Sequence, residues 1–350
     1  MPELDDLDKR LLNLIQGEFP LVERPYAALA ERTGATEAAV MERIAALKRG
    51  RIIRQINAIF DTRALGYQSS LVAARYAPEQ LHQGALIVNQ HPGVSHNYER
   101  AHAFNLWYTI AVPPGSDLQA HIDALHRLSG AEATRTLPTL RLFKIGVDLD
   151  MAGERTLDAK GTPEYTDEMR RAAQTIPLTA EDIALVRELQ EDLPVEPEPF
   201  AGMAARLGTS VPGLFAHAAR MKANGHLRRY AAILYHRKAG FRANGMAVWK
   251  VPVEQVPVVG PKMAGFRAVS HCYQRPIYPD WPYNLFTMIH AHTEAECQAI
   301  IDAIQRETGI SEYAVLYSTT EYRKVRVKYF DPALEEWERQ HVRPAVAAAL

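Results

Sequence analysis

The chain has 350 residues, of which 47% are hydrophobic and 23% are charged, a composition typical of a globular protein with two or three domains. Its 40 basic and 41 acidic side chains give a net charge of -1, so the overall charge does not favour a nucleic-acid or membrane partner. No apolar run approaches the roughly 18 residues of a membrane helix, and the acidic N-terminus does not resemble a signal peptide. Two cysteines exclude a disulfide scaffold, and we expect a cytoplasmic protein.

Apolar side chains in residues 4–60 recur with the spacing of three short helices. The second and third of these helices end at glycines, Gly34 and Gly50, and a Thr-Gly-Ala-Thr turn separates them. This arrangement predicts a helix-turn-helix, followed by a strand that begins at Ile52.

After this region the pattern changes to alternating strands and helices. We predict strands over 67–76, 93–100, 104–112 and 139–149, and helices over 78–90 and 116–128. The resulting order is βαββαβ, which predicts a ferredoxin-like domain with an antiparallel sheet.

The second half of the chain repeats the first half. At an offset of 174 residues, Pro20, Gly34, Arg54 and Gly66 match Pro194, Gly208, Arg228 and Gly240. The predicted fold class is therefore α+β, a tandem repeat of a helix-turn-helix domain and a ferredoxin-like βαββαβ domain. The expected segments are two domains at 1–60 and 61–150, a polar linker at 151–177, two domains at 178–238 and 239–332, and a C-terminal helix at 333–350.

One short motif occurs in both repeats. Ser95-His96-x-Tyr98-x-Arg100 reappears as Ser270-His271-x-Tyr273-x-Arg275. Because side chains alternate along a strand, the histidine, tyrosine and arginine of each motif share one face of the predicted sheet. In the first repeat His102 follows at the same parity, and Asn105 opens the next strand. Each repeat is therefore expected to present an imidazole, a phenol and a guanidinium in a row.

The second repeat carries an insertion after its motif, from Pro276 to Pro282. The insertion contributes Tyr278 and Trp281, and Asn284 beyond it matches the asparagine of the first repeat. Its prolines cannot donate to a sheet ladder, so we predict a stiff aromatic loop. An aromatic loop beside a polar strand face suits a flat conjugated ligand with charged edges.

A helix-turn-helix followed by a βαββαβ domain resembles the Lrp/AsnC regulators, which dimerise through their sheets. The segments VSHNYERAHAFNLWYTI and VSHCYQRPIYPDWPYNLFTMIH are more specific and resemble the paired signatures of the siroheme decarboxylases. The chain is similar to the fused, two-subunit (D–L) type on the route to haem d₁ or an alternative haem. The resemblance implies removal of carbon dioxide from the acetate side chains at ring positions 12 and 18 of siroheme, giving 12,18-didecarboxysiroheme.

The resemblance also implies roles for the two rows. His96 and His271 are expected to be general acids, because imidazole titrates near neutrality. Arg100 and Arg275 are expected to bind the substrate's carboxylates. The other expected substrate contacts are Tyr98, His102, Asn105, Tyr273, Tyr278, Trp281 and Asn284. No cofactor and no metal site are expected, because the iron tetrapyrrole is itself the substrate.

An alternative interpretation is an Lrp/AsnC-like transcription regulator that senses haem or another tetrapyrrole in the same pocket. In residues 1–60, however, nine Lys and Arg balance nine Asp and Glu. The candidate recognition helix of the second repeat, VPGLFAHAARMKANG, has almost no base-reading side chains. We therefore expect no DNA binding. A third interpretation is a tetrapyrrole carrier, which needs the arginines but not the histidines.

Further expectations concern the partners and the remaining titratable residues. We expect a homodimer or higher oligomer that forms through the ferredoxin-like sheets. His290 and His292 share one strand parity, so either placement in the sheet or a metal site remains open. His121 is expected to be solvated on its helix, and Cys272, which alternates with its neighbour His271, is expected in the core.

Overall fold

The computed structural model describes residues 4–145, 176–234, 243–291 and 293–342, so the predicted linker lies outside the described residues except for its last two positions. The chain forms two compact units. Unit 1 comprises Met1–Tyr67, Ala173–Lys238 and Lys328–Asp331, and unit 2 comprises Gln68–Ala172, Ala239–Val327 and Pro332–Leu350. Corresponding parts of the two repeats therefore join one another in each unit.

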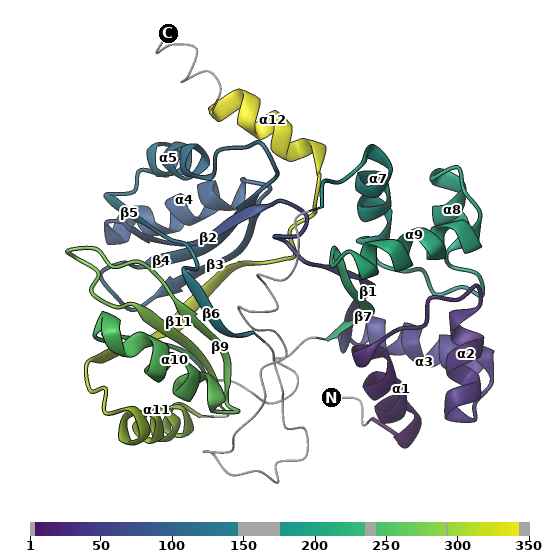
Figure 1. Ribbon diagram of the computed structural model, residues 1–350, viewed down its shortest axis with the longest axis horizontal. Coiled ribbons are helices and arrows are strands. Elements are labelled where there is room, and N and C mark those ends of the chain that lie inside the picture. Colours follow the sequence, from purple (N-terminus) through teal and green to yellow (C-terminus); the bar gives the residue numbers. More distant parts are fainter. Residues whose placement is uncertain (1–3, 146–175, 235–242, 292, 343–350) are drawn as a thin grey trace. The chain divides into compact units, whose positions relative to one another are not determined.

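Unit 1 contains the helical domains of both repeats (Figure 1). Its helices are α1 (Asp6–Gly17), α2 (Pro25–Thr33), α3 (Glu37–Arg49), α7 (Ala180–Leu189), α8 (Ala201–Arg206) and α9 (Val211–Ala223). The first repeat supplies β1 (Ile53–Phe60), which pairs antiparallel with β7 (Leu227–Leu234) of the second repeat. The three helices and the strand that the sequence predicts for the first repeat are therefore present, and the strand joins the two repeats.

Side chains strengthen this joint between the helical domains. The Asp192 carboxylate accepts hydrogen bonds from Lys48 Nζ and from the Ile56 backbone N–H, each at 2.8 Å. The Tyr26 hydroxyl donates to the Pro194 carbonyl oxygen at 2.8 Å. The two helical domains thus brace each other within one chain.

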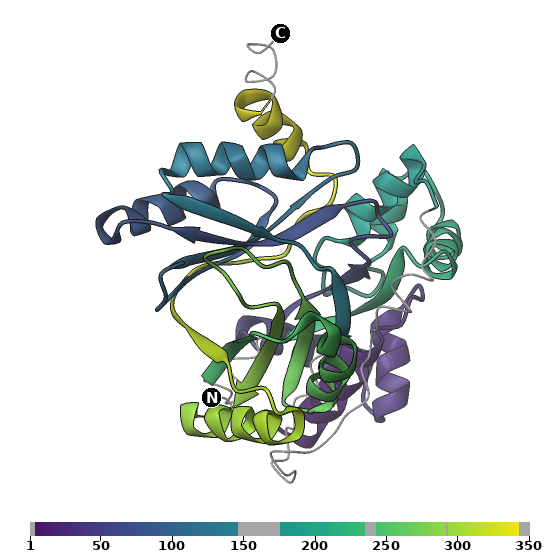
Figure 2. The same ribbon diagram turned by 60° about the vertical axis from the view of Figure 1, so that its left-hand side comes forward.

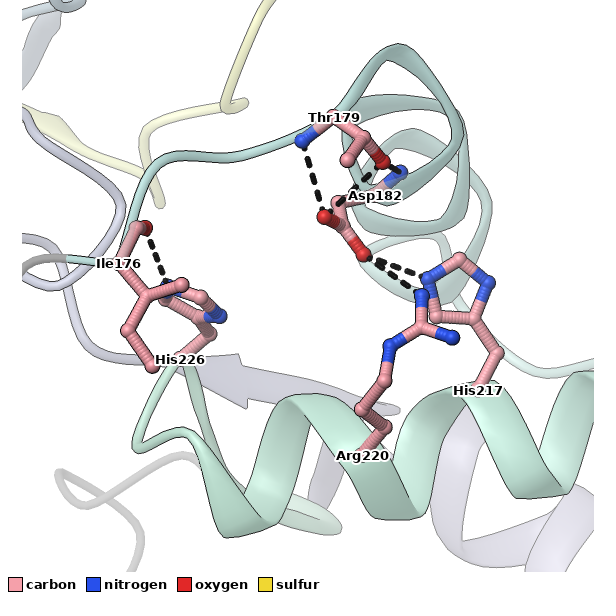
Figure 3. Close-up of polar contacts among 6 residues, drawn as sticks. All are labelled: Ile176, Thr179, Asp182, His217, Arg220 and His226. Carbon is pink, nitrogen blue, oxygen red and sulfur yellow. Dashed lines mark hydrogen bonds and ion pairs between the residues drawn. The ribbon is translucent and has the colours of Figure 1, made fainter.

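A buried carboxylate lies in the first turn of the first helix in each helical domain. In the second domain this is Asp182, whose Oδ1 accepts hydrogen bonds from His217 Nε2 at 2.6 Å and Arg220 Nη2 at 3.1 Å (Figure 3). Its Oδ2 binds the backbone N–H and hydroxyl of Thr179, which caps the helix. Burial by itself raises the pKa of Asp182, but the hydrogen bonds from His217, Thr179 and Arg220 outweigh it and hold that pKa well below its usual range.

We expect Asp182→Asn to lower the free energy of unfolding by about 2 kcal/mol at pH 7, because hydrogen bonds to a buried charged group are lost. The folded-state pKa lies below the unfolded one, so this contribution is complete above the unfolded pKa of about 4 and is lost as the pH falls through the folded value. Urea unfolding at pH 7 and pH 3 measures it. Glu181→Gln, at an exposed neighbour, is the control. Equal effects of the two substitutions at pH 7 would contradict the assignment.

Unit 2 is built on a nine-stranded sheet with the order β5-β2-β4-β3-β11-β8-β10-β9-β6. Its strands are β2 (Gln68–Arg75), β3 (Val94–Arg100), β4 (Leu106–Val112), β5 (Ala133–Leu137), β6 (Arg141–Ile145), β8 (Ala243–Trp249), β9 (Val269–Gln274), β10 (Leu285–Ala291) and β11 (Tyr313–Lys324). The two outermost strands, β5 and β6, are consecutive in the chain. The sheet therefore folds into two facing layers, one for each repeat (Figure 2).

The last strand of each repeat crosses from its own layer to the other one. The first part of β11 pairs with β8, and residues 318–324 pair with β3 of the first repeat. In the first repeat β5 pairs with β2, and β6 then pairs with β9 of the second repeat. The predicted strand over 139–149 contains β6, and its residues 146–149 lie outside the described residues. The prediction missed β5, which begins at Ala133. Pro138, which has no N–H to donate, lies between the two strands.

Helices cover the outer faces of both layers (Figure 1). They are α4 (Pro78–Asn89), α5 (Leu118–Ser129) and α12 (Pro332–His341) on the first repeat, and α10 (Val256–Gly265) and α11 (Glu294–Thr308) on the second. The short helix η2 (Val253–Gln255) leads into α10 and buries none of its residues. The inner faces form a separate core that includes Trp107 and Leu137 of the first repeat and Trp281, Phe286 and Leu316 of the second. Of the helices in the described residues, none has both the length and the apolar character that crossing a membrane requires.

The expectation that His121 is solvated is wrong. His121 is fully buried, its Nδ1 lies 2.9 Å from His91 Nε2, and its ring stacks on Trp337 of α12 with centroids 5.2 Å apart. The helical spacing correctly gives α5 one apolar face, but the position of α12 could not be read from that spacing. Helix α12 begins one residue before the predicted C-terminal helix at 333–350, whose residues 343–350 lie outside the described residues.

Candidate active site

The two His–Tyr–Arg rows lie on the inner faces of unit 2. Their strands hold equivalent positions, because β3 lies between β4 and β11 while β9 lies between β10 and β6. Tyr98 is opposite Trp107 in the ladder, and Tyr273 is opposite Phe286. Trp107 and Phe286 belong to the core between the layers. The two histidines, His96 and His271, lie near enough for a positive charge on His96 to lower the pKa of His271. The structure therefore brings both rows into one interior.

Each row has the same internal geometry. The ring centroids of His96 and Tyr98 are 6.1 Å apart, and those of His271 and Tyr273 are 6.0 Å apart, with an interplanar angle of 31° in both pairs. Each guanidinium lies over the ring of the tyrosine in its own row, at 5.7 Å for Arg100 and 4.8 Å for Arg275. The repeated sequence motif thus produces a repeated structural motif.

A serine fixes each histidine. The β3–β4 register shifts between Val94 and His96, and the β9–β10 register shifts between Val269 and His271, so Ser95 and Ser270 are the extra residues of two equivalent bulges. Bulges re-aim side chains beside functional sites. Ser95 Oγ lies 2.9 Å from His96 Nδ1, and Ser270 Oγ lies 2.7 Å from His271 Nδ1. Sequence reasoning assigned these serines no role, although their repetition directly before both histidines was a usable signal.

Each arginine is a buried clamp between the repeats. Arg100, 5% exposed, donates from Nη1 to the Leu316 carbonyl oxygen on β11, and Arg275, 8% exposed, donates to the Leu137 carbonyl oxygen on β5. Among the residues that the structure describes, the buried Nε of each has no hydrogen-bond partner and neither guanidinium has a carboxylate partner. Burial lowers the pKa of both arginines to about 10. Two desolvated cations with spare donors favour an anionic ligand.

The surroundings of His271 are also cationic. Burial, followed by repulsion from His290, Arg275, His96 and Lys144, lowers the pKa of His271 to about 3. Lys144 on β6, which sequence reasoning did not place in the site, is buried and donates to the Phe266 carbonyl oxygen at 2.8 Å. The His271 imidazole is therefore neutral at pH 7. Negative charge placed beside these cations would raise its pKa.

The insertion of the second repeat packs against the first repeat. Trp281 is fully buried, with its ring centroid 5.0 Å from that of Trp107 and 5.3 Å from that of His102. The Tyr278 hydroxyl donates to the Thr136 carbonyl oxygen on β5 at 2.6 Å. The indole Nε1 of Trp281 is buried and has no acceptor among the described residues. Tyr278 and Trp281 thus hold the two layers together, and contact with a substrate remains a prediction for both.

The two asparagines have backbone partners on both sides of their amides. Asn105 accepts from the Tyr76 N–H at 3.0 Å and donates to its carbonyl oxygen at 2.9 Å. Asn284 does the same with Val251, at 3.0 and 2.8 Å. These bonds favour a bracing role over the predicted substrate contact. His102 Nδ1 accepts from the Phe104 N–H at 3.1 Å, and its other nitrogen leaves the predicted contact open.

Cys272 and His290 are the remaining residues that the sequence raised as candidates for packing or metal binding. Cys272 is fully buried in the core under α10, as expected, and burial raises its thiol pKa to about 12. Within the described ranges, no group of three or more His, Cys, Asp or Glu side chains is arranged to hold a metal ion. His290 lies in β10, whereas His292, the other residue of the open metal-site interpretation, lies outside the described residues.

Comparisons with known proteins agree along the chain. Residues 8–54 and 182–228 match the siroheme decarboxylase NirDL-like HTH domain, and residues 64–144 and 238–323 match the AsnC-like ligand binding domain. The siroheme decarboxylase of Hydrogenobacter thermophilus is 40% identical over 337 residues, which are 96% of this chain and 98% of that protein. A crystal structure of the siroheme decarboxylase NirDL has a TM-score of 0.77 and 35% identity, over 97% of this chain and 99% of that one. NirDL in complex with an iron-uroporphyrin III analogue has the same TM-score with 34% identity, over 97% and 100% of the two chains.

The lowered pKa of His271 predicts how the free energy of unfolding depends on pH. Between about pH 3 and the unfolded pKa of about 6.5, the unfolded chain binds more protons at this position than the folded chain, so the free energy of unfolding rises with pH in that window. We expect His271→Gln to reduce this rise, by up to about 1.4 kcal/mol per pH unit. Unfolding curves from pH 4 to pH 8 measure it, with His82→Gln at an exposed imidazole as the control. Parallel stability profiles of wild type and His271→Gln would refute the assignment.

Proposed function

The chain belongs to the siroheme decarboxylase family, and on that basis we propose that it decarboxylates siroheme without oxidation, removing the acetate carboxyl groups at ring positions 12 and 18. The product is 12,18-didecarboxysiroheme. The observation that carries this proposal is the shared interior with two equivalent His–Tyr–Arg rows, whose arginines are buried cations with unused donors. The iron tetrapyrrole is the substrate, and we propose no further cofactor.

The rim of siroheme carries eight carboxylates, which match the charge of the interior. Arg100 and Arg275 approach from opposite layers, so they would hold the macrocycle by two separate carboxylates and fix its orientation. Their bonds to Leu316 and Leu137 use only Nη1, which leaves the buried Nε available. The pairing also offsets the desolvation of both guanidinium groups.

Each decarboxylation consumes one proton. A proton added to the pyrrole ring carbon makes the ring an electron sink, which accepts the electron pair of the breaking bond as carbon dioxide leaves. A second proton converts the exocyclic methylene to a methyl group, and the first proton leaves the ring. We assign these transfers to His96 and His271, whose rings lie beside the arginines in each row. The apolar residues opposite the tyrosines, Trp107 and Phe286, would exclude water from the scissile carboxylate.

The pairing of sheets expected between two subunits occurs here between the two repeats of one chain. We propose that whole chains associate further through their ferredoxin-like domains into a homodimer or higher oligomer, and that the reaction takes place in the cytoplasm. The regulator interpretation is not favoured, because relatives over the whole chain are decarboxylases by name and because the helical domains brace each other.

Anaerobic incubation of the purified protein with siroheme, followed by mass analysis of the tetrapyrrole, tests the function directly. We expect the loss of two carbon dioxide units. His96→Ala and His271→Ala are each expected to lower the rate by about 100-fold or more, because a positioned acid is removed. His82→Ala, at an exposed imidazole of α4, should retain full activity. Binding of siroheme with no change in its mass would contradict the enzyme and indicate a tetrapyrrole carrier.

Substitution of the clamping arginines tests substrate binding separately. Arg100→Lys and Arg275→Lys keep the charge but lose the forked donors, so we expect the dissociation constant for siroheme to rise about 10- to 100-fold. Absorbance titration under anaerobic conditions measures this change, and circular dichroism verifies that the variants fold. Arg127→Lys, at an exposed position of α5, is the control. An unchanged dissociation constant in a folded variant would remove that arginine from the binding site.

A further inference from the structure

A chain of three hydrogen-bonded side chains ends at the second histidine of the site. His290 on β10 places its Nε2 2.8 Å from Ser270 Oγ, and the same oxygen lies 2.7 Å from His271 Nδ1. Ser270 is the bulge residue of β9, which explains how its hydroxyl reaches both imidazoles. His290 retains partial exposure, so solvent can exchange protons with it.

The first repeat has only part of this chain. Ser95 Oγ is bonded to His96 Nδ1, but the position equivalent to His290 is Ala111. The backbone confirms the equivalence, because the Ala111 N–H donates to Gly93 and the His290 N–H donates to Ala268, at matching positions of the two repeats. Both repeats therefore have the serine bonded to the histidine of the row. They differ at the equivalent positions 111 and 290, which are alanine in the first repeat and histidine in the second.

A neutral imidazole is a poor acid when it acts alone. Loss of the Nε2 proton from neutral His271 would leave an imidazolate, unless Nδ1 gains a proton in the same step. Arg275 on β9 and Lys144 on β6 carry positive charges that oppose a charge on His271. His290 on β10 and His96 on β3 oppose it as well whenever they are protonated. The acid at this position therefore needs a second group that supplies its proton.

Building on the proposed function, we propose that His290, acting through Ser270, positions His271 and resupplies the proton that His271 gives to the substrate. His271 donates its Nε2 proton, the Ser270 hydroxyl passes its proton to His271 Nδ1, and His290 passes its Nε2 proton to Ser270. His290 enters this step as an imidazolium and leaves it neutral, and His271 is left with its proton on Nδ1. Water returns the proton of His290, and proton exchange with water restores the Nε2 tautomer of His271 before the next transfer. The second repeat is thus the half of the chain through which protons enter.

His290→Gln separates proton relay from packing. The glutamine amide keeps a donor for Ser270 Oγ but cannot carry a proton. We expect kcat for siroheme decarboxylation to fall about 10- to 100-fold with KM unchanged, and the pH–rate profile to lose the limb that belongs to the relay. Ser270→Ala, which removes the middle of the chain with a smaller change, should give the same profile.

Two comparison variants sharpen the test. Ser95→Ala removes the matching hydroxyl from the repeat that has Ala111 at the position of His290, so it should lower kcat without changing the shape of the pH profile. His82→Gln should leave kcat, KM and the profile unchanged. An unaltered profile in both His290→Gln and Ser270→Ala, or an equal change of profile in Ser95→Ala, would overturn the relay.

The relay can fail independently of the proposed function. If the wild-type protein does not decarboxylate siroheme, the proposed function fails. Nitrogen-15 NMR of the ligand-free protein then still tests the hydrogen bonds from His290 through Ser270 to His271. We expect the proton of neutral His271 on Nε2, and a shift of the Nδ1 resonance in Ser270→Ala. We also expect His271 to titrate at higher pH in His290→Gln, because one repelling charge is gone. A His271 spectrum that neither substitution changes would overturn the proposal.

Discussion

The hydrogen bonds that two crossing strands make with the opposite repeat hold unit 2 together. Strand β11 extends the layer of the first repeat, and β6 extends that of the second, so neither layer is complete without the other. Arg100 donates to a carbonyl oxygen of β11, the crossing strand of the second repeat. Arg275 donates to a carbonyl oxygen of β5, the strand directly before the crossing strand β6. The residues that we assign to substrate binding therefore also bind the two layers to each other. Because both layers belong to one chain, the interior forms at any protein concentration.

The interior between the layers raises the free energy of the folded protein when no ligand is bound. Arg100 and Arg275 are desolvated cations without a carboxylate among the described residues, and His271 is kept neutral by burial and by its cationic neighbours. A polyanionic ligand reverses each of these costs, because it supplies the missing acceptors and offsets the repulsion. Binding and protonation are consequently linked, and the carboxylates that orient the substrate also make its acid easier to protonate.

Local patterns predicted most of the elements, and contacts between distant residues account for the differences. The duplication, the helix-turn-helix spacing, the βαββαβ order and the burial of Cys272 all follow from short-range periodicity and parity. The crossing strands did not follow, because pairing between β11 and β3 has no signature in either strand alone. The same limit applies to the site, where parity placed each row correctly but could not reveal the Ser270 bulge. It also could not show that Trp281 packs into the inner core.

Duplication within one chain permits the two rows to differ. In a dimer of identical subunits, a histidine behind one serine would necessarily occur behind the other as well. Here position 111 is alanine and position 290 is histidine, so the shared interior receives one relay imidazole instead of two. A second imidazole would add another positive charge to a site whose charges already repel protonation of His271. Fusion of the repeats thus allows one repeat to specialise in proton supply while both keep the buried arginine that a polycarboxylate requires.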